Sequence, residues 1–328
     1  MRYLRNLNTD ANYNMAFDEY ALEQLPLDEP LFYLWQNRAA VIIGINQDIH
    51  AEVDLDYARE HDIMVARRIT GGGAVYHDLG NLNYTIVGRS TDMERDYPEY
   101  ARYMLHALQS LGVRAELSGR NDILVDGRKV SGYAKRVYKD RLMVHGTLMF
   151  DVDIDRLTRV LTPPTEKLES KGIASVKSRV LNLRDRLPQF EHINALTEAL
   201  ERYLSRQYQD AEYHLTTSQL AEIQHIANNK FATPEWLYGR SPSHAVTYTK
   251  RLPCGHVAVH MDIKKGVIAQ CTITGDFLGN ASIVAIETLL QGCLYERTAI
   301  HERLAIVNMQ DYLDNTDNET FINLLFNL

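Results

Sequence analysis

The stretch RRITGGGAVYHDLGN, Arg67–Asn81, holds three consecutive glycines, Gly71, Gly72 and Gly73, after two arginines. Glycine loses more backbone freedom on folding than any other residue, so three in a row are costly. Backbone without Cβ atoms lets a ligand come close and can direct N–H groups at oxygen atoms, and arginine suits carboxylate or phosphate groups. The stretch matches neither a P-loop nor a dinucleotide fingerprint. It predicts either a glycine loop that contacts an anion or a loose turn.

Length and composition indicate a globular protein of about two domains. The chain has 328 residues, of which 45% are hydrophobic and 24% charged, and a net charge of −8. No apolar run is long enough to span a bilayer, and the N-terminus does not resemble a signal peptide. The negative charge argues against non-specific nucleic-acid binding. We therefore expect neither nucleic acid nor a membrane as partner.

The cysteines indicate a reducing compartment. Cys254, Cys271 and Cys293 are odd in number and form no C-x-x-C pair. A disulfide framework or a zinc site is not expected from this spacing. The cytoplasm is the compartment that fits.

Apolar periodicity predicts mixed helices and strands. Asp126-Gly127 between two β-rich runs predicts a tight hairpin. The order of elements favours an α+β or mixed α/β fold over a repeating βαβ pattern. Helices are expected at 12–25, 53–62, 97–112, 153–161 and 194–208, and strands at 31–35, 40–45, 64–70, 82–89 and 141–152.

A domain boundary is predicted near Pro242, which lies among serines after Gly239. Beyond it, two strands around a Lys-Lys-Gly turn precede a helix at 283–295. We expect a catalytic domain at 1–242 and a small α+β unit at 243–328.

Lys129 is the leading catalytic candidate. It follows the predicted hairpin turn, and Ser131-Gly132 comes directly after it. A lysine here is either a solvent-facing hairpin residue or a cation held on a rigid strand between two anions.

Two further segments carry the same ambiguity. His145 precedes Gly146 in VHGTL, and is either a packed strand histidine or a site residue beside a close backbone approach. The segment KGIASVKSRVLNL, 171–183, is either a solvated basic loop or a loop that closes over a phosphate.

Taken together, these motifs resemble the lipoate–protein ligase A family. The stretches RRITGGGAVYHDLGN, GRND, GRKVSGYA, VHGTLMFDVD and KGIASVKSRVLNL occur in the family's order and spacing. VHMDIKKGVI and LQGCLY resemble the family's accessory domain, so the similarity covers nearly the whole chain. The combination is far more specific than any single motif.

The resemblance implies a fold and a reaction. The fold would be an α+β, biotin/lipoate ligase-type mixed β-sheet catalytic domain with flanking helices, plus a small α+β C-terminal accessory domain. Lipoate or octanoate would react with ATP, with Mg²⁺ offsetting the polyphosphate charge, to give acyl-AMP and pyrophosphate. The acyl group would then pass to a lysine on lipoyl domains of 2-oxoacid dehydrogenase complexes or on the glycine-cleavage H protein. A monomer is the simplest expectation.

The resemblance also implies roles for residues. Lys129 would contact both the acyl carbonyl and the α-phosphate, because two anions that react with each other need a cation between them. Glu19 and Trp35 would lie near the acyl arm. The metal ligands stay unassigned, with Asp122 as the one candidate. The implied lipoate- and adenylate-binding set is Arg68, Thr70, Gly71, Gly72, Gly73, Ala74, Val75, Tyr76, His77, Asn81, Asn121, Asp122, Ser131, Gly132, Ala134, His145, Gly146, Thr147, Lys171, Gly172, Ser178 and Arg179.

Alternatives remain. An ATP-independent octanoyl or lipoyl transferase of the same fold can use a cysteine nucleophile, but all three cysteines lie after residue 250. A biotin ligase or a non-catalytic acyl-binding protein are further readings, and the presence of Lys129 argues against loss of chemistry. Val144 replaces the first histidine of the family's H-H-G-T-L, and Tyr133 fills the variable position of S-G-x-A.

Overall fold

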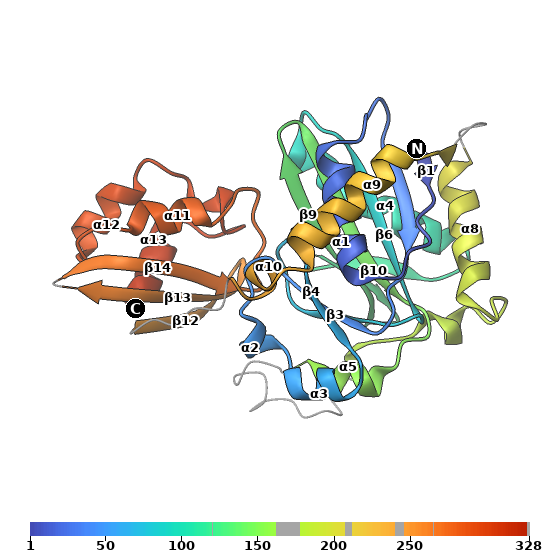
Figure 1. The fold of residues 1–328 in the computed structure, drawn as a ribbon, viewed down its shortest axis with the longest axis horizontal. Coiled ribbons are helices and arrows are strands. Elements are labelled where there is room, and N and C mark those ends of the chain that lie inside the picture. The colour runs from blue at the N-terminus through green and yellow to red at the C-terminus, as the bar shows by residue number, and fades with distance from the viewer. Residues whose placement is uncertain (120, 162–177, 207–211, 240–245, 265, 327–328) are drawn as a thin grey trace.

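A computed structural model of the chain describes residues 1–119, 121–161, 178–206, 212–239, 246–264 and 266–326. It has a large N-terminal body and a smaller C-terminal unit that lies beside it (Figure 1). The predicted boundary at 242 falls between the described residues 239 and 246. None of the described helices is long and apolar enough to cross a membrane.

An eight-stranded mixed sheet forms the centre of the large body. β1 pairs in parallel with β2 and with β11, while the other neighbours are antiparallel, which confirms the expected mixed sheet. The strands in spatial order are β11 (Glu212–Tyr213), β1 (Arg2–Leu4), β2 (Leu31–Trp35), β6 (Asn81–Arg89), β10 (Arg141–Met149), β9 (Arg128–Tyr138), β8 (Asp122–Val125) and β7 (Ala115–Ser118).

Both faces of this sheet are buried, because side chains alternate between two cores. Phe32 and Leu34 pack in a core shared with α4 (Met93–Ser110) and α8 (Ile193–Ser205). Tyr33 and Trp35 pack in a second core, shared with α1 (Ala11–Glu23) and α9 (Thr217–Ile226). Helices on two sides of one sheet are visible in Figure 1.

A second sheet carries the glycine loop. Its order is β4 (Met64–Arg67), β3 (Ala40–Ile43) and β5 (Val75–His77), so the three glycines connect its two outer strands. The remaining short elements of the large body are α2 (Ile49–Glu52), α3 (Leu55–Glu60), α5 (Ile154–Val160), η1 (Leu183–Arg186), the π-helical turn η2 (Ala227–Phe231) and α10 (Pro234–Tyr238).

The C-terminal unit has its own core behind a three-stranded antiparallel sheet. The predicted helix at 283–295 is shorter than expected: Gly292, with φ +80, turns the chain back, and its N–H donates to Ile268 O. The elements are β12 (Val246–Leu252), β13 (Gly255–Lys264), β14 (Val267–Gly275), α11 (Val284–Leu290), α12 (Arg297–Leu304), η3 (Met309–Asp311) and α13 (Asn318–Leu325).

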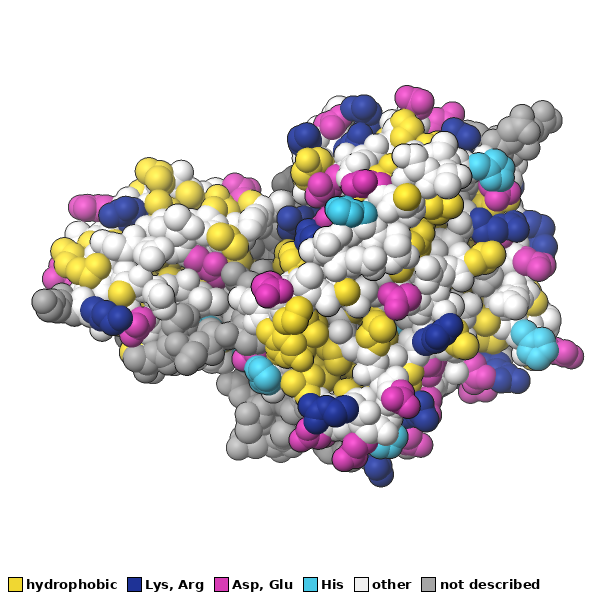
Figure 2. All heavy atoms as spheres, viewed as in Figure 1, with side chains coloured by type: hydrophobic (Ala, Val, Ile, Leu, Met, Phe, Trp, Pro, Cys, Tyr) yellow, Lys and Arg dark blue, Asp and Glu magenta, His cyan; other side chains and the backbone are white. Residues whose placement is uncertain are grey.

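The hairpin signal is confirmed. Asp126 and Gly127 both have positive φ, +51 and +71, as the tight turn between β8 and β9 requires. Charges of both signs are interspersed over the visible face of the molecule (Figure 2).

Candidate functional site

A cavity of about 120 Å³ opens between the glycine loop and one face of the main sheet. A single water needs about 10–15 Å³ measured in this way, so the cavity has room for much more than one water molecule. The lining residues are Met15, Trp35, Ile42, Arg68, Gly72, Gly73, Ala74, Val75, His77, Asn83, Asn121, Lys129, Gly132, Tyr133, Ala134, His145, Gly146 and Thr147.

Two rows of side chains on the main sheet lie beneath the cavity, and most of them line it. Trp35, Asn83 and Thr147 lie opposite one another on β2, β6 and β10. Two residues along each strand, the next row contains Thr85 and His145 and faces the same way. The register of the main sheet therefore brings together residues that are far apart in the chain.

The same alternation explains the missing first histidine. Val144 is fully buried in the core on the opposite face of the sheet, among residues packed under α4. A side chain at this position points away from the cavity. Val144 therefore takes no part in the contacts of His145.

Asp18 on α1 is a functional candidate that the sequence analysis missed. Its carboxylate is buried and accepts three hydrogen bonds: from Tyr33 Oη at 2.5 Å, Thr85 Oγ1 at 2.9 Å and His145 Nδ1 at 2.6 Å. Burial and then the Asp18 charge raise the pKa of Tyr33 well above its usual value, so the phenol keeps its proton. This carboxylate fixes the orientation of His145.

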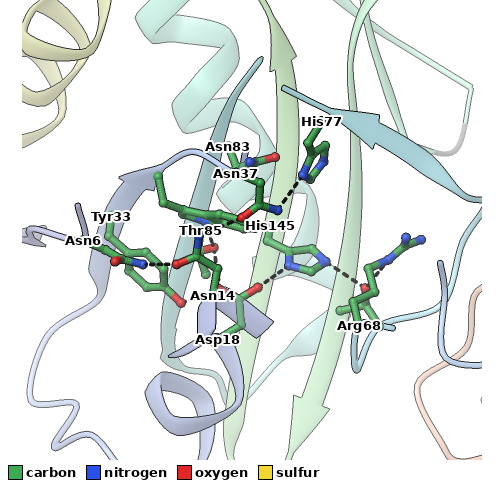
Figure 3. Close-up of polar contacts among 12 residues, drawn as sticks. Asn6, Asn14, Asp18, Tyr33, Asn37, Arg68, His77, Asn83, Thr85 and His145 are labelled. Carbon is green, nitrogen blue, oxygen red and sulfur yellow. Dashed lines mark hydrogen bonds and ion pairs between the residues drawn. The ribbon is translucent and has the colours of Figure 1, made fainter. Parts of the chain in front are cut away.

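From His145 the network continues to the glycine loop (Figure 3). His145 Nε2 lies 2.7 Å from Thr70 Oγ1, which also accepts a hydrogen bond from Arg68 Nε at 2.9 Å. Because Arg68 can only donate, the Thr70 hydroxyl hydrogen is available to His145. A chain of buried hydrogen bonds thus joins α1, β10 and the loop.

Arg68 holds the loop itself. Its guanidinium donates to the carbonyl oxygens of Ile42 at 3.0 Å, Gly71 at 2.7 Å and Gly73 at 2.8 Å. Burial, followed by the neighbouring Arg67, lowers the pKa of Arg68 to about 10, so it remains charged at neutral pH. A buried cation with carbonyl partners makes this wall of the cavity attractive to an anion.

The three glycines have different neighbours. A Cβ on Gly71 would lie 2.5 Å from Phe277 O in the C-terminal unit. Gly72 has φ +90, and its N–H donates to the same oxygen at 3.2 Å. Gly73 lines the cavity. Gly71 is therefore required by contact with the C-terminal unit, and Gly72 both makes that contact and lines the cavity; the sequence had suggested only a ligand or a loose turn.

Lys129 reaches the cavity because of a bulge. The register between β8 and β9 shifts next to Lys129, and a Cβ on Gly132 would lie 2.8 Å from Lys129 Nζ. Gly132 thus leaves the space that the lysine crosses. Nζ pairs with Asp122 Oδ1 at 2.7 Å, and the lysine side chain is 39% exposed. The amine is therefore accessible from outside the cavity.

The end of the predicted basic loop lies against Lys129. Leu181 N–H donates to Lys129 O at 2.9 Å, and Val180 forms a parallel bridge with Lys129. Ser178 and Arg179 are exposed. The predicted site residues Lys171 and Gly172 lie outside the described residues.

Several predicted site residues do not line the cavity. Tyr76 packs in the core behind β3, and burial raises the pKa of its phenol to about 12. Ser131 is buried, with its hydroxyl 3.4 Å from Tyr84 Oη. Asn81 donates to Asn83 Oδ1 at 2.9 Å.

Glu19, an acyl-pocket candidate, instead pairs with Lys230, while its neighbour Asp18 enters the site. The sequence did contain a signal for Asn83: polar residues alternate along the strand at Asn81, Asn83 and Thr85, which places all three on one face. The other acyl-pocket candidate, Trp35, lines the cavity together with Ile42 of β3, whereas Val41 and Ile43 of the same strand pack in the core that contains Tyr76.

Comparison with known proteins adds independent findings. Residues 10–205 match the model of the lipoyl protein ligase A/B catalytic domain, and residues 241–325 match that of the bacterial lipoate protein ligase C-terminus. The chain is 39% identical to the lipoate–protein ligase LplJ of Bacillus subtilis and 37% identical to lipoate–protein ligase 1 of Staphylococcus aureus. Each alignment covers 99% of this chain and 100% of the relative.

Solved structures agree on the fold. LipL1 of P. falciparum in complex with lipoate has a TM-score of 0.78 at 24% identity and covers 98% of this chain and 97% of its own. A bipartite lipoate protein ligase of Thermoplasma acidophilum, described with its E2 lipoyl domain, has a TM-score of 0.65 at 32% identity, covering 75% and 98%. Lipoate-protein ligase A bound with ATP has a TM-score of 0.62 at 27% identity, covering 73% and 98%.

Proposed function

Since the chain belongs to the lipoate–protein ligase family, we propose that it activates lipoate with ATP and transfers the lipoyl group to a lysine of a lipoyl domain. The enzyme is a lipoate–protein ligase, which forms acyl-AMP and pyrophosphate in its first step. The observation that carries the proposal is Lys129, whose amine enters a cavity bounded by the glycine loop and an apolar wall.

Lys129 has the geometry for the charge problem of the first step. A carboxylate must approach the α-phosphate, and the two anions repel each other. The Lys129 amine bears three donors on a strand held by sheet hydrogen bonds, and it is partly exposed. One such preorganised donor contributes roughly 3 kcal/mol to transition-state stabilisation. The same amine would stabilise the acyl carbonyl oxygen when the acceptor lysine attacks.

The cavity residues support separate parts of the substrate. Met15, Trp35 and Ile42 supply apolar surface for the acyl arm. Gly73 and the buried Arg68 give the opposite wall a positive character. We assign Asn121, whose amide donates to Tyr133 O at 2.9 Å, to the adenylate side of the cavity.

Mg²⁺ would accompany ATP. Among the described residues no group of three His, Cys, Asp or Glu side chains could hold a metal ion. Magnesium in nucleotide sites usually takes most of its ligands from phosphates and water, with one or two carboxylates. Asp122, beside Lys129, fits that single-carboxylate role.

The transferase alternative receives less support. A cysteine nucleophile would have to reach the acyl carbonyl, and no cysteine is among the cavity-lining residues. The described cysteines belong to the C-terminal unit, where Cys254 and Cys293 are part of its core. The ligase names of the two bacterial relatives point the same way.

The protein that accepts the lipoyl group is proposed from the similarity to a relative described with such a protein. The Thermoplasma acidophilum relative is described together with an E2 lipoyl domain. We propose lipoyl domains of 2-oxoacid dehydrogenase complexes or the glycine-cleavage H protein as acceptors, a monomeric enzyme, and the cytoplasm as its location. The odd, unclustered cysteines support a reducing compartment.

Mass spectrometry of an unmodified lipoyl domain tests the function. The domain is incubated with the enzyme and lipoate, with and without Mg-ATP. A lipoyl mass increase that requires ATP is expected. Transfer from an octanoyl carrier protein without ATP, and none from free lipoate, would establish the transferase instead.

Lys129→Met tests the role of the amine. This change keeps the apolar stem and removes the charge, so lipoyl-AMP formation is expected to fall by about a hundredfold or more. The matched control is Lys139→Asn, which removes an exposed lysine just beyond β9 at a position of φ +55 that asparagine tolerates. Near-normal lipoyl-AMP synthesis by Lys129→Met, with the fold intact, would refute the assignment.

A further inference from the structure

Two buried donors in the cavity wall lack partners. His77 is 3% exposed and Asn83 is 1% exposed, and both line the cavity. Among the residues that the structure describes, neither His77 Nε2 nor Asn83 Nδ2 has a hydrogen-bond partner. Leaving one buried donor unpaired costs about 1–3 kcal/mol. Two such donors at one wall indicate that a bound molecule supplies the acceptors.

A relay of asparagines determines which His77 nitrogen carries the hydrogen (Figure 3). The carbonyl oxygens of Asn8 and Gln36 can only accept, so the Asn14 atom that faces them at 3.0 and 2.9 Å is Nδ2. Asn37 Oδ1 lies 2.8 Å from the same nitrogen, whose two hydrogens are shared among the three oxygens, so Asn37 turns its oxygen toward Asn14. Asn37 Nδ2 is then left to donate to His77 Nδ1 at 3.0 Å. His77 Nδ1 must accept, and its hydrogen lies on Nε2.

The relay is anchored and neutral. Asn6 Nδ2 donates to Asn14 Oδ1 at 2.9 Å, which completes the amide chain at its far end. Burial, then the charge of Arg68 and then His145, lower the pKa of His77 to about 3. The ring stands edge-on to Trp35, with centroids 6.1 Å apart. At neutral pH the His77 end of the relay is therefore a buried, uncharged N–H.

The donor pair lies away from the reacting end. Lys129 Nζ lies over Gly132 on β9, while Asn83 is on β6, two strands along the order β6-β10-β9. Adjacent strands are about 4.8 Å apart, so the lysine and Asn83 are roughly 10 Å apart across the sheet. An extended chain of octanoyl length spans a similar distance. Trp35, in register with Asn83, borders the same end.

We propose that the amide relay fixes His77 as an Nε2–H donor and that His77 and Asn83 contact the dithiolane sulfurs at the far end of lipoate. This inference rests on the proposed ligase function and adds a basis for substrate choice. Sulfur is a weak acceptor, whereas the terminal methyl of octanoate accepts nothing. Octanoate therefore offers neither donor an acceptor, whereas the sulfurs of lipoate offer acceptors to both.

Competition between the two acids tests the proposal. The ratio of kcat/KM for lipoate to that for octanoate is measured by acyl-AMP formation in the full-length enzyme. The wild type is expected to favour lipoate. Asn83→Leu replaces one donor by an apolar group. The double variant His77→Phe with Asn37→Leu removes the other donor, and it also removes the Asn37 amide that would otherwise lose its hydrogen-bond partner. Each is expected to lower the ratio about tenfold, chiefly through the KM for lipoate.

The position of the hydrogen on His77 is tested by a measurement that a change in packing alone would not alter. The nitrogen shifts of His77, measured by NMR, are expected to show hydrogen on Nε2 and none on Nδ1 in the wild type, and a mixture of both forms in Asn37→Leu. Asn194→Leu, an exposed asparagine on α8, is the matched control and should change neither the shifts nor the ratio.

The outcomes separate the two proposals. If the wild type activates lipoate and the variants keep its lipoate-to-octanoate ratio, the donor pair has no role in selection and this inference fails alone. Hydrogen on His77 Nδ1 would refute the relay. If the wild type activates neither acid with ATP, the proposed function fails, and the inference fails with it.

Discussion

At the scale of single residues, burial decides how the polar side chains of this cavity act. Arg68 is buried and donates to backbone carbonyls of β3 and of the glycine loop, with no carboxylate partner among the described residues, and it remains charged at neutral pH. His77 responds in the opposite way, because its ring loses its charge when it is desolvated beside a cation. One wall of the cavity therefore presents a fixed cation next to a neutral donor.

The neutral state of His77 has a consequence for stability. Its native pKa is about 3, whereas an unfolded histidine titrates near 6.5. Between these values the unfolded state holds the extra proton, so the free energy of unfolding falls as the pH falls, by up to about 1.4 kcal/mol per pH unit from this group. Urea denaturation of the wild type and of the His77→Phe, Asn37→Leu double variant, from about pH 6.5 down to about pH 4, measures the slope. The double variant should be less sensitive to acid, and equal slopes would contradict the native pKa.

Some site residues could be predicted from the sequence and others could not. Lys129 and the glycine loop could be predicted because unusual residue types stand beside turn signals. Asp18 could not, because nothing in the local sequence separates its carboxylate from that of the adjacent Glu19, which pairs with Lys230 instead. Its role arises from hydrogen bonds to Tyr33 and His145, which are 15 and 127 residues away in the chain. Such long-range partners come from the sheet register.

At the scale of elements, strand alternation does most of the positioning. Neighbouring residues on β10, Val144 and His145, belong to different faces of the sheet, so one enters the core and the other the cavity. The longer strands could be predicted because apolar runs and the Asp126-Gly127 turn are local signals, although the predicted ranges 40–45 and 64–70 extend past the ends of β3 and β4. The bulge that directs Lys129 over Gly132 could not, since it depends on how β8 pairs with β9.

The N-terminus of α1 offers a test at this scale. Asp10 caps the helix by accepting the Tyr13 N–H at 2.9 Å, and the helix carries Asn14 and Asp18 into the site. Asp10→Ala is expected to lower the free energy of unfolding by about 1 kcal/mol. Urea denaturation measures the loss, and Asp10→Asn, which retains the cap, is the control. Equal stability of the Ala and Asn variants would show that the cap contributes nothing.

At the scale of the whole molecule, the C-terminal unit touches the catalytic body at the glycine loop. Gly72 N–H donates to Phe277 O, and Gly275 N–H donates to Asn46 O at 2.9 Å. Lys135 on β9 pairs with Asp314 at 3.4 Å, and both side chains are largely buried. The loop that borders the substrate cavity is thus also a domain contact. Sequence alone had no means to predict this, because the partners lie about two hundred residues apart.

Gly71→Ala tests that contact. The new Cβ would lie 2.5 Å from Phe277 O, and neither side gives way easily, because the obstacle is backbone and Arg68 holds the Gly71 carbonyl. The C-terminal unit is therefore expected to shift away, which breaks the Gly72–Phe277 hydrogen bond. Amide hydrogen exchange should become faster at Gly72 and in the segment 275–279.

The neighbouring Gly73→Ala is the matched control for that experiment. A Cβ on Gly73 meets only Asp276 Cβ at 3.9 Å, an ordinary contact distance. Both variants remove a glycine from the same loop, so a general loss of loop flexibility would alter exchange equally in both. Faster exchange in Gly71→Ala alone would tie the effect to the domain contact. Equal exchange in the two variants would mean that the C-terminal unit does not require a glycine at position 71. The requirement for glycine would then have to come from the ligand.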